Sequence, residues 1–411
     1  MIPEIITMFS TATTRKLKGD EGVLSSLRYY DAIRAAASDV KRPDGSNVDI
    51  VVDPSTEQEF ALCHLSSILP FTTGDYKPFR VAFEDTLSIA MAAHHLNTGD
   101  GSIVPELQGL NERCPVRFTT EFADTEFVGG ATLKNVVQQT SREPGAADRI
   151  PCAFIGAYRS AVSIPMSIVT GLLGYPQISG SSTSAELDDK TQYPLFGRTL
   201  PSDAGNAIPL IIYMREILQI KHLLVININD SYGNNYVEGM RNARDIYAPD
   251  MIIHQIPLDE GEKAVQSAVS SAKATEYRFI FAIVFTAQTH DQLMTEAYNQ
   301  GMAGDGQHNW IFGDSFLGTL DNRVFQKDSP LHLSYRGVGL LEITGGVAGF
   351  PKYDKYVEQM RELKNPTDLE YTRTLFPKHD HPDFNTDLTM EPNFLEPITS
   401  TCALEEDLNQ S

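Results

Sequence analysis

Residues 222–247 read HLLVININDSYGNNYVEGMRNARDIY. The stretch opens with an almost continuous apolar run at His222 to Ile228, passes through a polar loop, and continues into a helical pattern at Val237 to Tyr247. A continuous apolar run is typical of a strand that is buried on both faces, as in a parallel sheet covered by helices. These residues therefore predict one strand–loop–helix unit of an α/β fold.

The same alternation recurs on both sides of this stretch, so we expect an α/β protein with parallel sheets flanked by helices. In the first half, the patterns predict strands at 78–85 (PFRVAFED), 116–122, 152–157 and 175–179, and helices at 86–96, 128–139 and 160–173. In the second half, they predict strands at 222–228, 251–256, 279–285 and 310–313, and helices at 207–219, 237–247, 264–274 and 290–300.

These two series predict two lobes with a less regular segment at each end. We expect an N-terminal extension at 1–78, with a helix at 25–37 and a short strand at 48–52, because little sustained periodicity is present there. The first lobe is expected at 79–205 and the second at 206–345. Residues 346–411 are rich in Pro and charge and predict an irregular C-terminal segment.

Charge and length limit the possible partners. The 411 residues carry a formal net charge of −21, which would repel phosphate backbones, so we expect no nucleic-acid partner. No apolar stretch is long enough to span a bilayer, and the first 20 residues lack the order of a secretory signal. The four cysteines show no metal spacing, and free thiols or one or two disulfides remain open.

Motifs of catalysis are missing. The sequence contains no GxGxxG after a strand, no GxxxxGK[ST] and no GxSxG, and its histidines supply two convergent metal ligands at most. We therefore expect no enzyme, no cofactor and no metal site. Small ligands and other proteins remain as partners.

Polar residues follow the strands of the first half. Ser160 begins a predicted helix, and Ser181, Ser182 and Thr183 precede another. Hydroxyls beside the free N–H groups of a helix N-terminus form an anion seat that suits a carboxylate. Helix capping is the alternative role of such residues.

Three further residues lie at strand ends or loops beside them. Asp203 and Asp314 occupy corresponding places, and a carboxylate there can pair with an ammonium group, while the Tyr232 ring can stack on a ligand. The alternative is that Asp203 caps a helix and that Tyr232 is a turn residue before Gly233.

The stretch GAYRSAVSIPMSIVTGLLGYPQISGSSTSAELDDKTQYPLFGRTLPSD, Gly156 to Asp203, closely resembles a receptor family ligand-binding region. This region is shared by class C G-protein-coupled receptors, natriuretic-peptide receptors and the amino-terminal domains of ionotropic glutamate receptors. The later run NDSYGNNYVEGM is similar to that family in order and spacing. The resemblance covers roughly Phe79 to Gly346, and it implies a two-lobed fold of the type 1 periplasmic-binding-protein kind, a Venus flytrap that closes on a ligand.

The resemblance also implies roles for single residues. In members that bind amino acids, hydroxyls hold the α-carboxylate, and two Asp and a Tyr hold the α-amino group. Matching positions here are Ser160, Ser181 and Thr183 for the hydroxyls, Asp203 and Asp314 for the acids, and Tyr232 for the aromatic. Two departures are Arg159, in place of a small residue, and an end at Ser411 before the elements that usually complete the first lobe, which predicts an incomplete first lobe.

We therefore expect a receptor ligand-binding region that senses an amino acid or a similar zwitterion by closing its cleft. The family implies a homodimer through the first lobe, an extracellular or membrane-associated location, and membrane attachment only through a module that these residues lack. Alternatives are a solute-binding protein for a transporter, a dimerisation scaffold from a truncated receptor, and an α/β enzyme.

Overall fold

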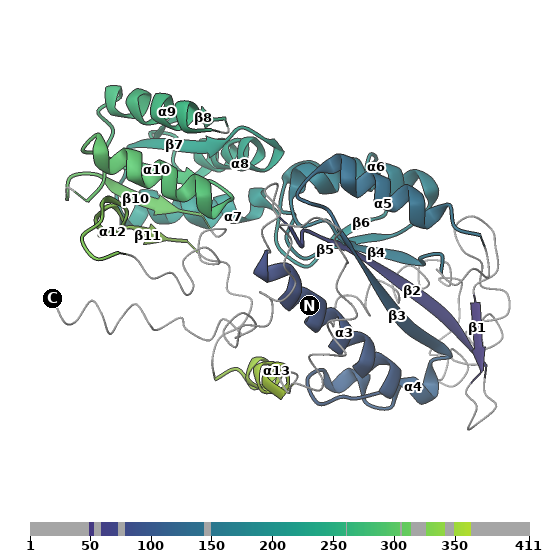
Figure 1. The fold of residues 1–411 in the computed structure, drawn as a ribbon. Coiled ribbons are helices and arrows are strands. Elements are labelled where there is room, and N and C mark those ends of the chain that lie inside the picture. The colour runs from purple at the N-terminus through teal and green to yellow at the C-terminus, as the bar shows by residue number, and fades with distance from the viewer. Residues whose placement is uncertain are drawn as a thin grey trace. The chain divides into compact units, whose positions relative to one another are not determined.

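The computed structural model describes residues 49–52, 59–72, 79–143, 149–259, 261–304, 306–313, 326–341 and 349–362. They form two compact units, each with its own sheet (Figure 1). Unit 1 takes its residues from Met1–Ser182, Lys190–Leu200 and Gly346–Pro397, and unit 2 takes its described residues from Thr183–Asp189 and Pro201–Gly345. The lobe boundaries read from the sequence stay a prediction.

The sheet of unit 1 is built around one long strand, β2. This strand pairs in parallel with β3 and with β4, and in antiparallel with β1. The order is β1-β2-β4-β5-β6, with β3 also paired to β2. The strands are β1 (Asp49–Val52), β2 (Glu59–Leu69), β3 (Val116–Asp124), β4 (Ala153–Gly156), β5 (Gln177–Ser179) and β6 (Phe196–Arg198).

Helices cover both faces of this sheet. Leu69 packs with the buried residues of α3 and with Met360 of α13, whereas Ile68 packs with Val136 of α5 and Val162 of α6. Figure 1 shows α5 and α6 on one side of the sheet and α3 on the other. The helices are α3 (Arg80–Thr98), α4 (Leu110–Arg113), α5 (Gly129–Thr140), α6 (Ser160–Leu173) and α13 (Pro351–Glu362), with 3-10 turns η1 (Pro105–Leu107) and η2 (Ala185–Asp188), the latter in unit 2.

Strand β2 lies within the residues assigned from the sequence to an N-terminal extension, in which the strand predicted was a short one at 48–52. Its sequence, EFALCHLSSIL, carries polar residues that interrupt the apolar run, yet ten of these eleven positions are buried or half-buried. The Ser66 hydroxyl donates to Gln139 Oε1 at 2.5 Å, and His64 Nδ1 lies 2.8 Å from Thr119 Oγ1. Because these partners come from other elements, the sequence pattern alone does not reveal the strand.

The predicted strand at 78–85 is wrong, because residues from Arg80 onward form helix α3. Its buried residues Ala82, Phe83 and Leu87 recur with helical spacing and pack around Phe71 and Leu69. A helical stripe buries these side chains on one face, whereas a strand would place Ala82 and Phe83 on opposite faces. The predicted strand at 48–52 is confirmed by β1, and the predicted helix at 25–37 lies outside the described residues.

One disulfide joins two strands of unit 1. Cys63 on β2 bonds Cys152, directly before β4, with a Cα–Cα distance of 5.4 Å. The Cys152 N–H donates to the His64 carbonyl at 2.8 Å. The alternatives left open by the sequence are thus resolved for this pair, while Cys114 is half-buried and is not disulfide-bonded.

Unit 2 contains a parallel sheet in the order β11-β10-β9-β7-β8. The strands are β7 (His222–Ile228), β8 (Ile252–Leu258), β9 (Phe279–Ile283), β10 (Asn309–Phe312) and β11 (Gly339–Leu340). The helices are α7 (Asp203–Ile212), which continues as a π-helical turn η3 (Tyr213–Ile217), α8 (Ser231–Tyr247), α9 (Glu262–Ala274), α10 (Ala287–Asn299) and α12 (Pro330–Ser334).

Alternate residues of β7 face two separate cores. Leu223 and Val225 pack with α7 and α8, whereas Leu224 and Ile226 pack with α9 and α10. This two-sided burial is what the apolar run at 222–228 predicted, and the α/β class with parallel sheets flanked by helices is confirmed. Among the described residues, no helix combines the length and the apolar character needed to cross a membrane.

Candidate functional site

The carboxyl ends of β4 and β5 are joined by a cluster of serine hydroxyls around one carbonyl. The Ala157 oxygen accepts hydrogen bonds from Ser163 Oγ at 3.0 Å, Ser179 Oγ at 2.7 Å and Ser182 Oγ at 3.2 Å. Ser182 Oγ also donates toward the Tyr158 carbonyl at 3.3 Å. These hydroxyls hold the loop after β4 against the loop after β5, so their role is structural.

Ser160 and Ser181 lie on these two loops. Ser160 is the first residue of α6 and only 3% exposed, and Arg159 occupies the N-cap position without a side-chain capping bond. Ser181 is half-buried, and its N–H donates to Ser179 Oγ at 3.2 Å. The N-terminus of a helix of this length carries partial positive charge, which suits an anion such as a carboxylate.

Thr183 was expected to open a helix with Ser181 and Ser182, but only the short 3-10 turn η2 follows. Ser184 is the residue that caps this turn, through the Glu186 N–H at 3.3 Å. A single turn with its own cap has a much smaller dipole than a full helix, so the anion seat at this loop cannot rest on a helix N-terminus.

Unit 2 brings Thr183 and Asp203 together. The Asp203 N–H donates to the Thr183 carbonyl at 2.8 Å. Asp203 is the first residue of α7 and is 1% exposed, while Ser202 occupies the N-cap position that was the alternative for the aspartate. A carboxyl group therefore lies at a buried helix start beside a threonine.

Tyr232 lies in the first turn of α8 rather than in a turn before it, and it is 7% exposed. Its ring contacts Tyr236 edge to face at 6.2 Å. The next residue must be glycine, because a Cβ on Gly233 would lie 2.1 Å from the Ile228 carbonyl oxygen. Asn235 of the same helix donates to Ser184 Oγ at 2.9 Å, which fixes α8 against the segment that carries Thr183.

The structure thus groups the predicted residues in two sets, Ser160 and Ser181 in unit 1 and Thr183, Asp203 and Tyr232 in unit 2. Asp314 lies outside the described residues. The sequence analysis missed three aromatic residues that contact one another at the carboxyl edge of the unit 1 sheet, namely Phe79, Phe127 and Tyr158. Each of the three follows the end of a strand or precedes a helix. The sequence analysis selected its polar candidates by this same position, so position could also have indicated these aromatic residues.

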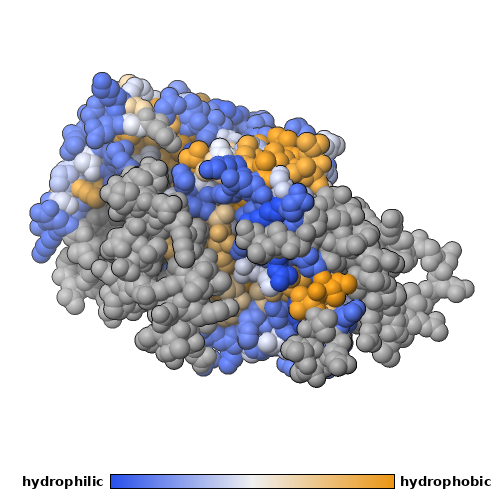
Figure 2. Space-filling model, turned by 45° about the vertical axis from the view of Figure 1, so that its right-hand side comes forward, coloured by the Kyte–Doolittle hydropathy of each residue, from blue (hydrophilic) through white to orange (hydrophobic). Residues whose placement is uncertain are grey.

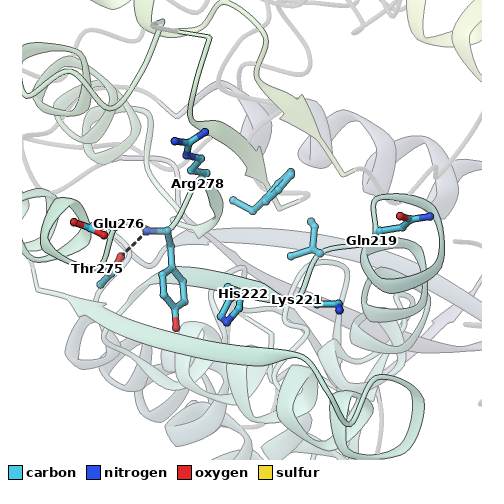
Figure 3. Close-up of a pocket in the computed structure, with 9 residues that line it drawn as sticks. Gln219, Lys221, His222, Thr275, Glu276 and Arg278 are labelled. Carbon is cyan, nitrogen blue, oxygen red and sulfur yellow. Dashed lines mark hydrogen bonds between the residues drawn. The ribbon is translucent and has the colours of Figure 1, made fainter.

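A pocket of about 440 Å³ lies elsewhere in unit 2, at the amino ends of β7 and β9. Figure 3 shows that the charged side chains of Lys221, Glu276 and Arg278 around it point in different directions. It contains none of the predicted residues, and ligands of open α/β sheets bind at the carboxyl ends of strands. Within the described ranges, no group of three or more His, Cys, Asp and Glu residues is arranged to hold a metal ion.

Comparison with known families gives a match to the receptor family ligand binding region over residues 147–381, more than half of the chain. The chain belongs to this family. Membership confirms the resemblance read from the Gly156–Asp203 stretch and the two-lobed periplasmic-binding-protein-like fold. Because the family is one of receptor ligand-binding regions, the expectation of binding rather than catalysis is also confirmed.

Curated relatives include metabotropic glutamate receptor 6 of Rattus norvegicus, 27% identical over 267 residues, which are 63% of this chain and 28% of the relative. Metabotropic glutamate receptor 4 of Mus musculus is 36% identical over 205 residues, covering 48% of this chain and 21% of the relative. The Drosophila melanogaster metabotropic glutamate receptor is 25% identical over 164 residues, 39% of this chain and 16% of the relative. The chain therefore matches less than a third of the length of each of these relatives.

Proposed function

We propose that this receptor ligand-binding region senses an amino acid or a similar zwitterion, and that the ligand drives closure of the two lobes. The observation that carries the proposal is that the predicted residues supply two kinds of polar group, hydroxyls in unit 1 and a carboxyl group in unit 2. In unit 1, the Ser160 hydroxyl lies at the start of α6. In unit 2, the buried Asp203 lies at the start of α7, and its N–H donates to the Thr183 carbonyl.

Ser160, Ser181 and Thr183 hold the carboxylate of the ligand in this proposal. The positive end of the α6 dipole stabilises a negative charge by roughly 0.3–1 kcal/mol, and more where the site is partly buried. Ser163, Ser179 and Ser182 are already bonded to the Ala157 carbonyl, which supports a division between structural and ligand-binding hydroxyls.

Asp203 and Asp314 receive the ammonium group, and Tyr232 stacks on the ligand. An ammonium group is chemically suited to a carboxylate such as that of Asp203, which is 1% exposed, because a charge-assisted hydrogen bond is strong where water is excluded. Closure follows if one ligand binds Ser160 and Ser181 of unit 1 and also Thr183 and Asp203 of unit 2, since only contacts made in the closed state shift the equilibrium. The names of the curated relatives, glutamate receptors, support an amino-acid ligand.

The test is a thermal-shift screen of the purified chain against the common amino acids, repeated with Asp203→Asn and Thr183→Ala. A ligand that binds only the folded state raises stability by RT ln(1 + [L]/Kd), about 2.7 kcal/mol at a hundredfold excess over Kd. We expect one group of amino acids to raise the Tm of the wild type, and both variants to lose that shift.

Glu238→Ala is the matched control, because this carboxylate is exposed on α8, in the same unit as Asp203. It should retain the full ligand response. A cooperative melt that no amino acid moves would refute the amino-acid ligand and favour the dimerisation scaffold.

We further propose that the region acts as a homodimer through unit 1, outside the cell. Helix α6 exposes Ile168 at 52% and Leu172 at 84%, and Leu195 of the same unit is 39% exposed. Figure 2 shows that hydrophobic surface on the face it presents gathers in patches. Apolar patches of this kind mark protein contacts, and the Cys63–Cys152 disulfide supports an oxidising, extracellular location.

A further inference from the structure

Three aromatic rings meet at the carboxyl edge of the unit 1 sheet. Phe79 contacts Phe127 with ring centroids 4.9 Å apart and Tyr158 with centroids 5.5 Å apart, and Phe127 and Tyr158 are 6.4 Å apart. All three pairs are edge to face. Each residue is only half-buried, so the cluster keeps ring surface available to solvent or to a ligand.

The backbone holds two of these rings in place. The Phe79 N–H donates to the Phe71 carbonyl at 2.9 Å, which ties Phe79 to the end of β2. The turn that carries Phe127 is organised by the buried Asp124. Its carboxylate accepts hydrogen bonds from the Phe71 N–H at 2.9 Å, the Thr72 hydroxyl at 2.6 Å and the Glu126 N–H at 2.8 Å.

This turn holds an unfavourable conformation. Glu126 and Phe127 are consecutive residues with φ of 51° and 56°, a left-handed region that costs a residue other than glycine roughly 1–2 kcal/mol. Besides the Asp124 bonds, Asn135 Nδ2 donates to the Asp124 carbonyl at 2.8 Å, and the Val128 N–H donates to the Thr125 carbonyl at 2.7 Å. Strain that its surroundings stabilise in this way clusters at functional sites.

The cluster adjoins the proposed carboxylate seat. Tyr158 precedes Ser160 by two residues, and its carbonyl accepts the Ser182 hydroxyl at 3.3 Å, next to Ser181. Tyr158 and Ser160 both follow β4, so the rings and the proposed carboxylate seat belong to the same edge of the unit 1 sheet.

We propose that Phe79, Phe127 and Tyr158 form the side-chain subsite of the ligand, and that it takes a bulky apolar or aromatic amino-acid side chain. The inference rests on the proposed function and specifies its ligand class. Aromatic walls bind rings edge to face or offset, a gain of about 0.5–1.5 kcal/mol per pair beyond the buried area.

Charge argues against an acidic side chain in this subsite. Glu126 lies directly beside Phe127 and would repel a second carboxylate, which would also lose hydration against three rings. Arg159, the nearby cation, already takes part in an interaction within the chain. The subsite thus favours L-phenylalanine over L-glutamate.

The experiment measures binding of L-phenylalanine, L-leucine, L-alanine and L-glutamate to the purified full chain by isothermal titration calorimetry. The wild type should bind L-phenylalanine at least about tenfold more tightly than L-glutamate, a difference of about 1.4 kcal/mol. Tyr158→Ala and Phe127→Ala should each weaken L-phenylalanine about tenfold and leave L-alanine unchanged.

Tyr158→Leu keeps an apolar side chain of similar volume, so a change in its binding is not caused by misfolding. This variant should lose the preference for L-phenylalanine over L-leucine. Tyr247→Ala, at an exposed tyrosine of α8, is the control and should bind as the wild type does. Tight L-glutamate binding without L-phenylalanine binding would overturn the subsite and leave the amino-acid sensor standing. Binding of no amino acid by a folded chain would overturn both.

Discussion

Ser182 and its neighbour Ser181 show that the role of a residue cannot be predicted from its type alone. Ser182 Oγ lies within hydrogen-bond distance of Ser163 Oγ at 2.8 Å and of two carbonyls, whereas the Ser181 side chain makes no hydrogen bond with the described residues. Both occur in one SSTS run, so the sequence predicts hydroxyls near a ligand without separating structural from binding ones. The structural role of Ser182 becomes clear only from its contacts with the carbonyls of Ala157 and Tyr158, which follow a different strand, β4.

We predict that Ser182→Ala and Ser181→Ala behave in opposite ways. Ser182→Ala removes a buried hydroxyl from its network and should lower the free energy of unfolding by roughly 1–3 kcal/mol. Ser181→Ala should change the free energy of unfolding by less than about 0.5 kcal/mol, because no side-chain hydrogen bond with the described residues is lost, while weakening ligand binding. Urea unfolding of both variants measures this, and equal losses of stability would contradict the division of roles.

Glu121 on β3 predicts a pH dependence of unit 1. Burial alone raises the pKa of this carboxyl group, but hydrogen bonds from His64 and Arg142 outweigh it and hold the pKa below its usual range. Arg142 Nη1 lies 2.6 Å from Glu121 Oε1. The pair therefore contributes stability at a pH above the unfolded pKa of about 4.3, and this contribution is lost as pH falls through the lower folded pKa.

Glu121→Gln should accordingly reduce stability by about 1.5 kcal/mol at neutral pH, the lower end of what hydrogen bonds to charged groups contribute, because the pair is partly exposed. The difference from the wild type should shrink as pH falls below about 4. Chemical unfolding at a series of pH values gives the comparison. A difference that grows toward acid would show that the carboxylate is not stabilised in the folded state.

At the scale of elements, a strand buried on both faces and a helix rich in apolar residues follow well from the sequence. Ranges 222–228 and 160–173 agree residue for residue with β7 and α6. β2 escaped prediction because Ser66 and His64 find partners on α5 and β3. The start of α3 was misassigned because a short apolar alternation fits either period. Helix α13 packs on unit 1 through Met360, a contact that sequence periodicity does not report.

The exposed face of α6 predicts self-association. Ile168 and Leu172 lie one turn apart, so a charge at Leu172 would lie in the middle of the proposed contact. Leu172→Glu should convert the proposed dimer to monomer in sedimentation-velocity runs. Ile246→Glu, at a residue 72% exposed on α8 of unit 2, should leave the oligomeric state unchanged.

A wild type that sediments as a monomer at micromolar concentration would contradict the proposed contact. The same holds for a dimer that both variants disrupt equally, because α8 does not belong to unit 1.

At the scale of the whole molecule, we expect the two units, each with its own sheet, to differ in how their stability responds to loss of the disulfide. The Cys63–Cys152 bond joins residues 89 apart within unit 1 only. Replacing both cysteines by alanine should lower the stability of unit 1 by about 2–4 kcal/mol. Hydrogen exchange read by mass spectrometry should show faster exchange in β2 and β4 and unchanged exchange in β7 and β9. Uniformly faster exchange would mean that the bond acts beyond its own sheet.

The candidate site was predicted less completely than the fold. Residue types at strand ends pointed to Ser160, Ser181, Thr183, Asp203 and Tyr232, and the structure describes where each lies within its own unit. The aromatic cluster was not predicted, because Phe79, Phe127 and Tyr158 come from three strand ends whose proximity depends on sheet order. Apolar residues near strand ends look like core residues until the sheet order is known.

The central place of β2 in its sheet has a consequence for how the chain folds during synthesis. Leu65 of this strand pairs with Ala153 of β4, and Ala61 pairs with Val116 of β3, so β2 leaves the ribosome well before either neighbour. At a synthesis rate of roughly 5–20 residues per second, β2 waits several seconds with only β1 available as a partner, at its Glu59 to Leu62 end. Unpaired strand edges recruit other chains. We therefore expect residues 59–69 to be open to pairing with other chains until β3 and β4 have been synthesised.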